Sequence, residues 1–160
     1  MAELDELPLK ARLFLKLYPW RRIDPTPSAP LRRPVRESRV AIVSSAGFAP
    51  EGQPPFDQDV RGGDPSFRIV EANTPVSSLG ESHRSWAFDH AGIQADPNLG
   101  FPIDRLRELA DDGTIGAVAP RHLSCMGSQT ATGRLVSQTA PEAVHTLVKD
   151  EVDLALLVPV

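Results

Sequence analysis

The sequence has little cysteine, no long apolar run and no excess of positive charge. Cys125 is the only cysteine among 160 residues, so neither an intramolecular disulfide nor a thiolate zinc site can form. No apolar stretch reaches the roughly 18 residues that cross a bilayer. The N-terminal segment MAELDELPLK carries acidic residues where a signal peptide needs basic ones. Together these absences predict a cytoplasmic protein with no membrane-spanning segment.

The net charge of −4 argues against nucleic acid as the main partner, because phosphate backbones attract basic proteins. The charge is unevenly distributed, however. Residues 1–39 carry nine Lys and Arg against five Asp and Glu, whereas residues 40–160 carry eight against sixteen. The basic segment could dock onto the acidic body or onto a partner subunit, and a solvated tail is the equal alternative.

The first part of the chain is rich in proline and arginine. Residues 8–18 are predicted to form a short amphipathic helix with one apolar stripe, made of Leu9, Leu13 and Leu17. The prolines that follow break helices and favour an extended arm. We therefore expect two regions: an N-terminal helix and arm in residues 1–38, and an α/β domain in residues 39–160.

Apolar strands alternate with helices in the rest of the chain. Strands are predicted at residues 40–43, 67–70, 115–119 and 154–158, and helices at 102–111 and from Pro141 onward. This alternation indicates an α/β fold with an open, mainly parallel sheet and helices on both faces, of Rossmann-like type. Sites in such sheets form at the carboxyl ends of strands, here in the loops after Val43, Ala119 and Val158.

The last predicted strand, residues 154–158, is fully apolar, and the sequence stops two residues later. A strand of this kind belongs inside a sheet and is usually followed by a covering helix. The pattern therefore predicts an α/β domain that is truncated at its C-terminus. The alternative is that this segment is simply the last strand of the sheet.

Three polar side chains lie close together in the sequence: His83, Asp89 and His90. They could act as acid and base or bind a metal. Their spacing matches no zinc signature, so we predict no metal site. The structural alternative is a loop whose histidines are satisfied by hydrogen bonds.

Residues 120–127 (PRHLSCMG) follow a predicted strand and are therefore expected in a loop at the productive edge of the sheet. His122 could serve as a base for Ser124 or Cys125, but no GxSxG elbow is present. An inert, half-buried Cys125 is the better prediction. Arg121 could hold a carboxylate in bidentate fashion, unless it is an exposed surface charge.

Short segments recur along the chain in the order of a known family. They are YPW at 18–20, RVAIVSSAG at 39–47, QPPFD at 53–57, GDPSFR at 63–68, SH at 82–83, FPIDRL at 101–106, GTIG at 113–116 and MG at 126–127. No single segment is diagnostic. Their ordered set resembles the selenoprotein B family of glycine, sarcosine, betaine and D-proline reductases.

The resemblance implies a subunit of an oxidoreductase that reductively cleaves a C–N bond of an amino acid or an amino-acid derivative. In that family, a strand such as residues 152–160 leads into a loop that bears selenocysteine or cysteine, a strong nucleophile when ionised. The substrate is activated on a pyruvoyl group of a partner subunit, and a dithiol supplies the electrons. The resemblance thus implies no cofactor in this chain itself, and it is compatible with a homo-oligomer.

The same resemblance assigns roles to the candidate residues. The expected nucleophile would follow Val160, and one hypothesis is that the reading frame was ended at a UGA codon that encodes selenocysteine. The catalytic candidates are His83, Asp89, His90 and His122, of which His83 or His122 would protonate the leaving amine. The candidates for substrate binding are Ser44, Ser45, Arg121, Ser124, Met126 and Gly127.

Two functions of other classes stay open at this point. A non-catalytic subunit would dock a partner through the basic arm, residues 21–39. A His-based metal hydrolase would use the histidine-rich stretch instead.

Overall fold

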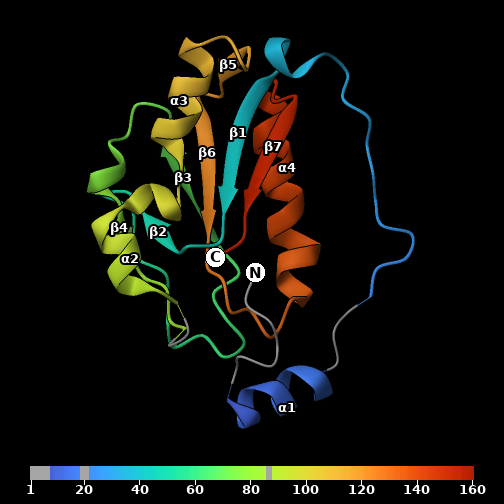
Figure 1. The fold of residues 1–160 in the computed structure, drawn as a ribbon, viewed down its shortest axis with the longest axis vertical. Helices are drawn as coiled ribbons and strands as arrows, with labels where there is room; N and C mark the ends of the chain where they lie inside the picture. Colours follow the sequence, from blue (N-terminus) through green and yellow to red (C-terminus); the bar gives the residue numbers. More distant parts are fainter. Residues whose placement is uncertain (1–7, 19–21, 86–87) are drawn as a thin grey trace. The chain divides into compact units, whose positions relative to one another are not determined.

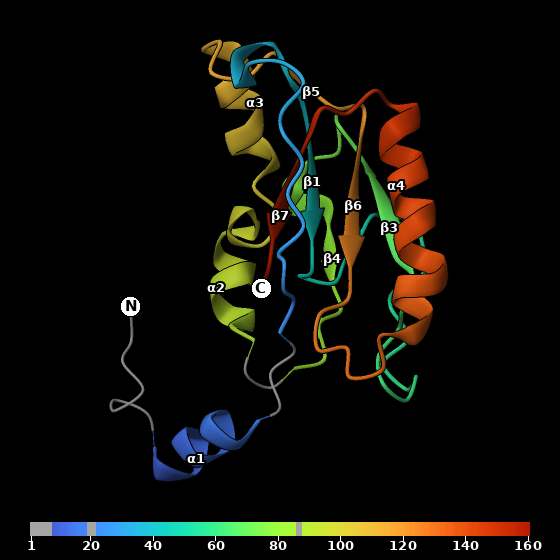
Figure 2. The ribbon, with the colours of Figure 1, turned by 90° about the vertical axis from the view of Figure 1, so that its right-hand side faces the viewer.

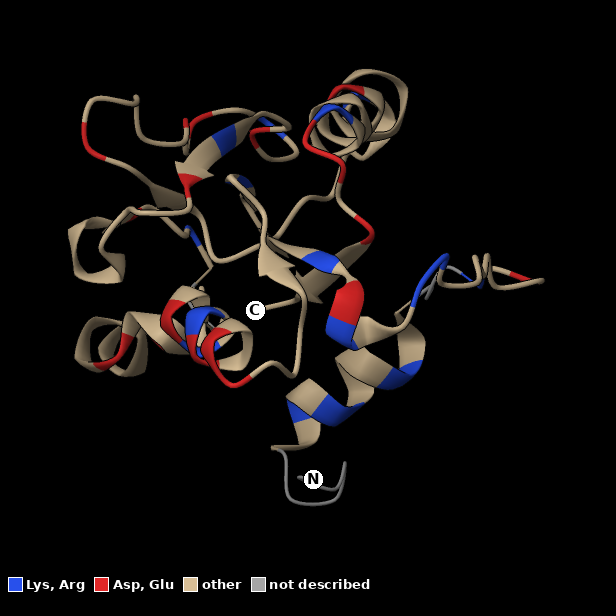
Figure 3. Ribbon diagram, turned by 90° about the horizontal axis from the view of Figure 1, so that it is seen from above, with Lys and Arg blue, Asp and Glu red and all other residues tan. Residues whose placement is uncertain are grey.

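The computed structural model describes residues 8–18, 22–85 and 88–160. The chain divides into two units, residues 1–30 and 31–160. In the first unit, the predicted helix is confirmed as α1, Leu9–Leu17. Its basic residues have no acidic neighbour within the helix (Figure 3). The predicted stripe of Leu9, Leu13 and Leu17 is exposed, and so is Phe14.

The second unit is built on a five-stranded open sheet (Figure 1). Its central strand is β1, Arg39–Ser44. Three strands pair with β1 in parallel: β5 (Ala117–Val118), β6 (Arg121–Cys125) and β7 (Leu154–Val158). The strand β3 (Phe67–Glu71) pairs with β6 in the antiparallel sense. The sheet is therefore mixed, with its parallel part around β1 as predicted.

Helices cover both faces of this sheet (Figure 2). On one face lie α2 (His90–Ala95) and α3 (Ile103–Asp111), and on the other lies α4 (Ala140–Lys149). A π-helical segment, Leu135–Thr139, leads into α4. Single turns of 3-10 helix span Val35–Glu37, Val76–Ser78 and Pro97–Leu99. A separate antiparallel ribbon pairs β2 (Phe48–Ala49) with β4 (Gly80–Glu81).

The core lies between the sheet and α3. Val40 and Ile42 of β1 contribute one side, and Phe101, Ile103 and Leu106 contribute the other. All five are at most 2% exposed. Burying a side chain of this size stabilises the fold by about 1.5–3 kcal/mol, which is why the apolar pattern of β1 and α3 determines where they pack.

The strands at 40–43, 67–70 and 154–158 and the helices at 102–111 and after Pro141 are confirmed as β1, β3, β7, α3 and α4. The strand predicted at 115–119 is wrong in extent, because only Ala117–Val118 is strand. The loop predicted at 120–127 is also wrong, since Arg121–Cys125 forms β6. The sequence RHLSC is mostly polar, so it shows no apolar strand pattern. Three of its five side chains are nevertheless buried by β1, β3 and the flanking helices.

The apolar strand β7 was expected inside the sheet, but it borders β1 alone among the strands that the structure describes. The Leu157 side chain of this strand is 68% exposed. Val144 and Val148 of α4 are exposed as well. No helix in the described part of the chain is long and apolar enough to cross a membrane.

Candidate functional site

The parallel strands β1, β6 and β7 end together at one edge of the sheet, as Figure 1 shows. Backbone hydrogen bonds link the chain just beyond these ends: the Gly47 N–H donates to the Cys125 carbonyl and the Ser45 N–H to the Val158 carbonyl. A shallow depression of roughly 190 Å³ opens here, and Ser45, Cys125 and Pro159 contribute to its lining. We call this region the carboxyl edge.

Ser45 connects the first of these strand ends to the last residue of the sequence. The Val160 N–H donates to the Ser45 hydroxyl oxygen at 3.0 Å. The Ser45 hydroxyl in turn lies 3.4 Å from the Val160 carbonyl oxygen, to which it can donate. Two segments that are 115 residues apart in sequence therefore meet at this serine.

His83 reaches the same edge from the end of β4. The Ser82 N–H donates to the Gly47 carbonyl, which extends the β2–β4 ribbon to the carboxyl edge. The imidazole is 5% exposed and stacks on the Phe88 ring at 4.1 Å between centroids. Its Nδ1 accepts a hydrogen bond from the Ser85 N–H at 3.3 Å. Burial lowers the pKa of His83, so the ring is neutral near pH 7.

With Nδ1 acting as an acceptor, the neutral ring carries its proton on Nε2. That Nε2 is buried and has no hydrogen-bond partner among residues 8–18, 22–85 and 88–160. A buried donor without a partner costs on the order of 1–3 kcal/mol, so an unused N–H of this kind is a candidate for ligand contact.

Two glycines allow the imidazole to approach the strand ends. A Cβ on Gly127 would lie 2.5 Å from the His83 Nε2 and 3.0 Å from the Ser45 carbonyl oxygen. A Cβ on Gly47, whose φ is +72°, would lie 3.2 Å from the His83 backbone nitrogen. The candidates Ser45, His83 and Gly127 are therefore brought together, and only glycine fits at position 127.

Glu81 organises this cluster, although no sequence signal singled it out. Its carboxylate accepts the backbone N–H of His83, and its second oxygen lies 2.8 Å from the His90 Nδ1. This hydrogen bond to Glu81 raises the pKa of His90. Because His90 is partly exposed and His83 is buried, the outer histidine carries positive charge more readily than the inner one.

Asp89 has a different place in the structure. Its carboxylate accepts the Gly92 N–H at 2.9 Å and caps the N-terminus of α2. The cap begins the helix at His90 and so positions the His90 side chain beside Glu81.

His122 and two of the candidate serines lie within the interior, on the α3 side of the sheet. The His122 Nδ1 accepts the Ile42 N–H at 3.0 Å, and its ring meets the Phe101 ring edge-on. Burial, together with the positive charge of Arg107, lowers the pKa of His122 to about 4. The Ser44 hydroxyl donates to the Gly100 carbonyl, and Ser124 is fully buried beside it.

Arg121 begins β6, whereas Cys125 ends it. Four residue steps of about 3.3 Å separate the two, so Arg121 lies about 13 Å from the carboxyl edge. Its guanidinium forms a bidentate ion pair with the Asp150 carboxylate at 2.6 and 2.8 Å.

Burial raises the pKa of the Cys125 thiol to about 11, so this cysteine remains protonated near pH 7. Met126 is buried and bridges to Ala46.

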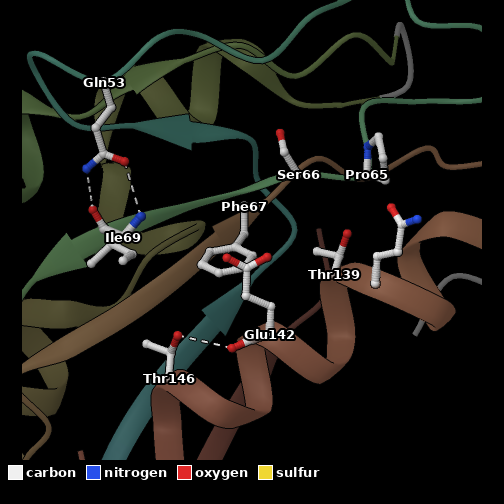
Figure 4. Close-up of a pocket in the computed structure, with 9 residues that line it drawn as sticks. Gln53, Pro65, Ser66, Phe67, Ile69, Thr139, Glu142 and Thr146 are labelled. Atoms are coloured by element: carbon white, nitrogen blue, oxygen red, sulfur yellow. Dashed lines mark hydrogen bonds between the residues drawn. The ribbon is translucent and has the colours of Figure 1, made fainter. Parts of the chain in front are cut away.

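A larger pocket of roughly 480 Å³ opens between β3 and α4, as Figure 4 shows. Its lining includes Phe67, Glu142 and Thr146, and none of the catalytic or substrate-binding candidates. Within it, the Gln53 side-chain amide donates to the Ile69 carbonyl at 2.6 Å and accepts the Ile69 N–H at 3.2 Å. Gln53 thereby covers the outer edge of β3, which is a structural role.

No group of three His, Cys, Asp or Glu side chains is placed to hold a metal ion in the part of the chain that the structure describes. The histidine-rich stretch instead forms the Glu81–His90 pair and the stacked His83, so no observation favours the metal-hydrolase reading.

Three curated proteins are similar to most of the chain. The D-proline reductase subunit gamma of Acetoanaerobium sticklandii is 29% identical over 149 residues, which are 93% of this chain and 57% of that protein. The sarcosine reductase complex component B subunit beta of Peptoclostridium acidaminophilum is 29% identical over 127 residues, which are 78% and 29% of the two chains. The glycine reductase complex component B subunit gamma of Symbiobacterium thermophilum is 25% identical over 151 residues, or 93% and 34%.

The chain therefore spans between 29% and 57% of the length of these relatives. No solved structure matches it. The model of one protein family, the glycine/sarcosine/betaine reductase selenoprotein B family, matches residues 8–159. Because that match takes in α1, the sheet and the carboxyl edge, this chain belongs to the glycine/sarcosine/betaine reductase selenoprotein B family.

Proposed function

We propose that this chain is a selenoprotein B-type subunit of a dithiol-dependent reductase that cleaves the C–N bond of an amino acid or an amino-acid derivative. The family match over residues 8–159 supports the reaction class. The observation that carries the proposal for the site is the meeting of Ser45, His83 and Val160 at the carboxyl edge. Sites in open α/β sheets form at such an edge.

The proposal includes the nucleophile that the resemblance implies. A selenocysteine or cysteine directly after Val160 would lie at the carboxyl edge, because the Val160 N–H is held by the Ser45 hydroxyl oxygen. An ionised selenolate or thiolate there would attack the carbon that bears the amine, so that the Se–C or S–C bond forms while the C–N bond breaks. A pyruvoyl group on a partner subunit would activate the substrate amine. The dithiol would then supply the two electrons that release the reduced product.

In this mechanism, the residues of this chain bind the substrate and move a proton. The leaving amine needs a proton, and we assign its delivery to His90, whose pKa is raised by Glu81. The inner histidine, His83, is kept neutral by burial and is better suited to donate a hydrogen bond than to lose a proton. The interior position of His122 leaves it no role in proton transfer.

The finer parts of the sequence prediction stay within this proposal. They are a Rossmann-like sheet, a cytoplasmic location, and a complex that includes a pyruvoyl-type partner subunit and could form a homo-oligomer.

The nucleotide sequence after codon 160 tests the proposed nucleophile. We expect a UGA codon, or a cysteine codon in a related gene, followed by a reading frame that resembles the family. A stop codon with no such frame behind it would remove the nucleophile from the proposal.

The activity is tested with a chain that continues with Cys after Val160, mixed with its partner subunit and dithiothreitol. We expect dithiol-dependent release of the amine, and its loss when that Cys is replaced by Ser. Cys125→Ser provides the matched comparison, because its high-pKa thiol should contribute nothing. If the first replacement left the activity intact, the mechanism would be refuted.

A non-catalytic, partner-binding role is the second candidate, and α1 favours it. Leu13 and Leu17 are more than half exposed on a helix that carries basic residues and no acidic ones. Leu13→Glu should abolish co-purification of the partner subunit while leaving the thermal unfolding of residues 31–160 unchanged. If only this variant lost function and every variant of the carboxyl edge kept it, the docking role would replace the catalytic one.

A further inference from the structure

The pocket between β3 and α4 is built from one face of a strand and one face of a helix (Figure 4). Phe67 and Ile69 alternate with Arg68 on β3, so their side chains point to the same side of the sheet. Thr139, Glu142 and Thr146 follow the spacing of neighbours on one face of a helix. The volume of roughly 480 Å³ is of the size that holds a small organic molecule.

Helix α4 has polar residues on the side that faces β3 and apolar residues on an exposed side. A helix that covers a sheet normally shows the reverse, because burial of apolar side chains stabilises the two layers. Here Val144 and Val148 are 58% and 67% exposed, whereas Glu142 and Thr146 line the pocket. The π-helical segment Leu135–Thr139 leads into this face, and such segments are rare and occur frequently at functional sites. Packing alone does not account for the polar face, whereas a polar ligand does.

The charge of the lining selects a cation. Glu142 is the one ionisable residue among the lining residues that the structure describes, and Lys, Arg and His are absent from them. Its carboxylate has no ion pair or hydrogen bond within the described residues. Figure 4 shows the Glu142 side chain extending from α4 towards the Phe67 ring. The face of an aromatic ring is electrically negative, so a cation placed between the two is attracted by both.

We propose that the pocket between β3 and α4 binds a small organic cation that carries a guanidinium group. A guanidinium is planar, so it fits against the Phe67 ring while its N–H groups donate to the Glu142 carboxylate. The Thr139 side chain makes no helix-capping hydrogen bond, which leaves its hydroxyl oxygen as a further acceptor. A metal ion fits less well, because it needs several oxygen or nitrogen ligands and the pocket offers a single carboxylate.

The test is an NMR titration of the full chain, labelled at its threonine methyl groups, with butylguanidinium, butylurea and butyrate. These probes share a short alkyl chain, and the guanidinium and urea groups have the same shape but differ in charge. Butylguanidinium should shift the methyl resonances of Thr139 and Thr146 in a saturable manner. Butylurea should bind about tenfold more weakly, because it loses both the ion pair and the attraction to the ring. Butyrate should cause no shift, and Thr114, which follows α3, serves as the internal control.

Two variants separate the charge from the ring. Glu142→Gln keeps the size of the side chain and removes its charge, so it should bind butylguanidinium about fivefold more weakly. Phe67→Leu keeps an apolar contact and removes the ring, which should weaken binding about threefold. Glu108→Gln is the matched control, because it removes the same charge from α3 on the other face of the sheet and should bind like the unchanged chain. Thermal unfolding of each variant shows that it is folded.

Three results would overturn the proposal. Equal affinity for butylurea and butylguanidinium would show that the pocket does not select charge. Equal weakening in Glu142→Gln and Glu108→Gln would show that the cation is attracted by the net charge of the chain and not by this carboxylate. The third result is the absence of any saturable shift at Thr139 and Thr146. None of these results touches the proposed function, because the lining contains none of the catalytic or substrate-binding candidates.

Discussion

Two histidines, one in the middle of the sheet and one at its carboxyl edge, use the same atoms in the same way. In each, Nδ1 accepts a backbone N–H, from Ile42 in the case of His122 and from Ser85 in the case of His83. In each, Nε2 is buried without a partner in the described parts of the chain, and burial lowers the pKa. Their surroundings differ, because His122 is enclosed by strands and Phe101, whereas His83 faces Gly127 and the strand ends.

The comparison teaches that burial and tautomer alone do not make a histidine functional. The His122 Nδ1 takes the place of a backbone carbonyl as the acceptor for the Ile42 N–H, within the parallel pairing of β1 with β6. This contact therefore stabilises the sheet. His83 makes its contact on a loop, at the one edge where three strand ends converge. The first histidine should therefore matter mainly for stability and the second mainly for the arrangement of the carboxyl edge.

The largest effect is expected for His122→Ala. The change leaves a cavity and an Ile42 N–H without its acceptor, and it should lower the free energy of unfolding by about 4 kcal/mol. His83→Ala should cost about 1–2 kcal/mol, because a loop can relax around the missing ring. Urea denaturation of both variants measures the difference, with His145→Ala on the exposed side of α4 as the control. Equal losses in the free energy of unfolding at positions 83 and 122 would contradict this difference between the two histidines.

The next effect is the pH dependence that His122 imposes on stability. Its folded pKa of about 4 lies below the ordinary value of 6.5, so the unfolded chain binds the proton more tightly. The stability from this group is therefore complete above pH 6.5 and is lost as the pH falls towards 4, by roughly 3 kcal/mol. Urea midpoints measured between pH 7 and 4 should show this slope, and His122→Gln should flatten it. An unchanged slope in the variant would assign the pH dependence to other groups.

The sequence predicted the strands and helices around the two histidines better than it predicted the surroundings of the histidines themselves. The strand β1 and the helix α3 were found because their apolar residues repeat at the strand and helix periods, and the core follows from them. The strand β6 was missed because its residues RHLSC contain one strongly apolar side chain. Only the tertiary structure shows that His122 and Ser124 are buried there, so the loop assigned to residues 120–127 placed Arg121 at the wrong end of the sheet.

The carboxyl edge itself was predicted, and so was the proximity of Ser45 and Gly127 to it. Glu81 was not, since its two contacts depend on different parts of the fold. The pairing of β4 with β2 directs its carboxylate to the backbone of His83, and the cap of α2 by Asp89 presents His90. A Glu two residues before a His in an extended segment would have been a usable signal, because alternate residues of a strand point to the same side.

A smaller effect on stability, but a clear one on the site, is expected for Gly127→Ala. The new methyl group would meet the His83 Nε2, and relieving that contact should cost about 1–2 kcal/mol. The Nε2–H resonance of His83 should move. Gly133→Ala is the matched control, because nothing lies within 4 Å of the added Cβ. If His83 kept its resonance in Gly127→Ala, the close approach of the two residues would be wrong.

Glu81→Gln should affect the fold least of these changes. It tests which of the two histidines of the site carries positive charge. The hydrogen bond from Glu81 raises the pKa of His90, so His90 should titrate above its ordinary value of 6.5 in the unchanged chain. The amide still offers an oxygen to the His83 N–H, but it cannot stabilise a charged imidazole as a carboxylate does. The titration midpoint of His90, followed by NMR, should therefore fall, while His83 stays neutral with its proton on Nε2. A midpoint that did not move would show that Glu81 positions the inner histidine without setting the charge of the outer one, and His90 would lose its assignment as the proton donor.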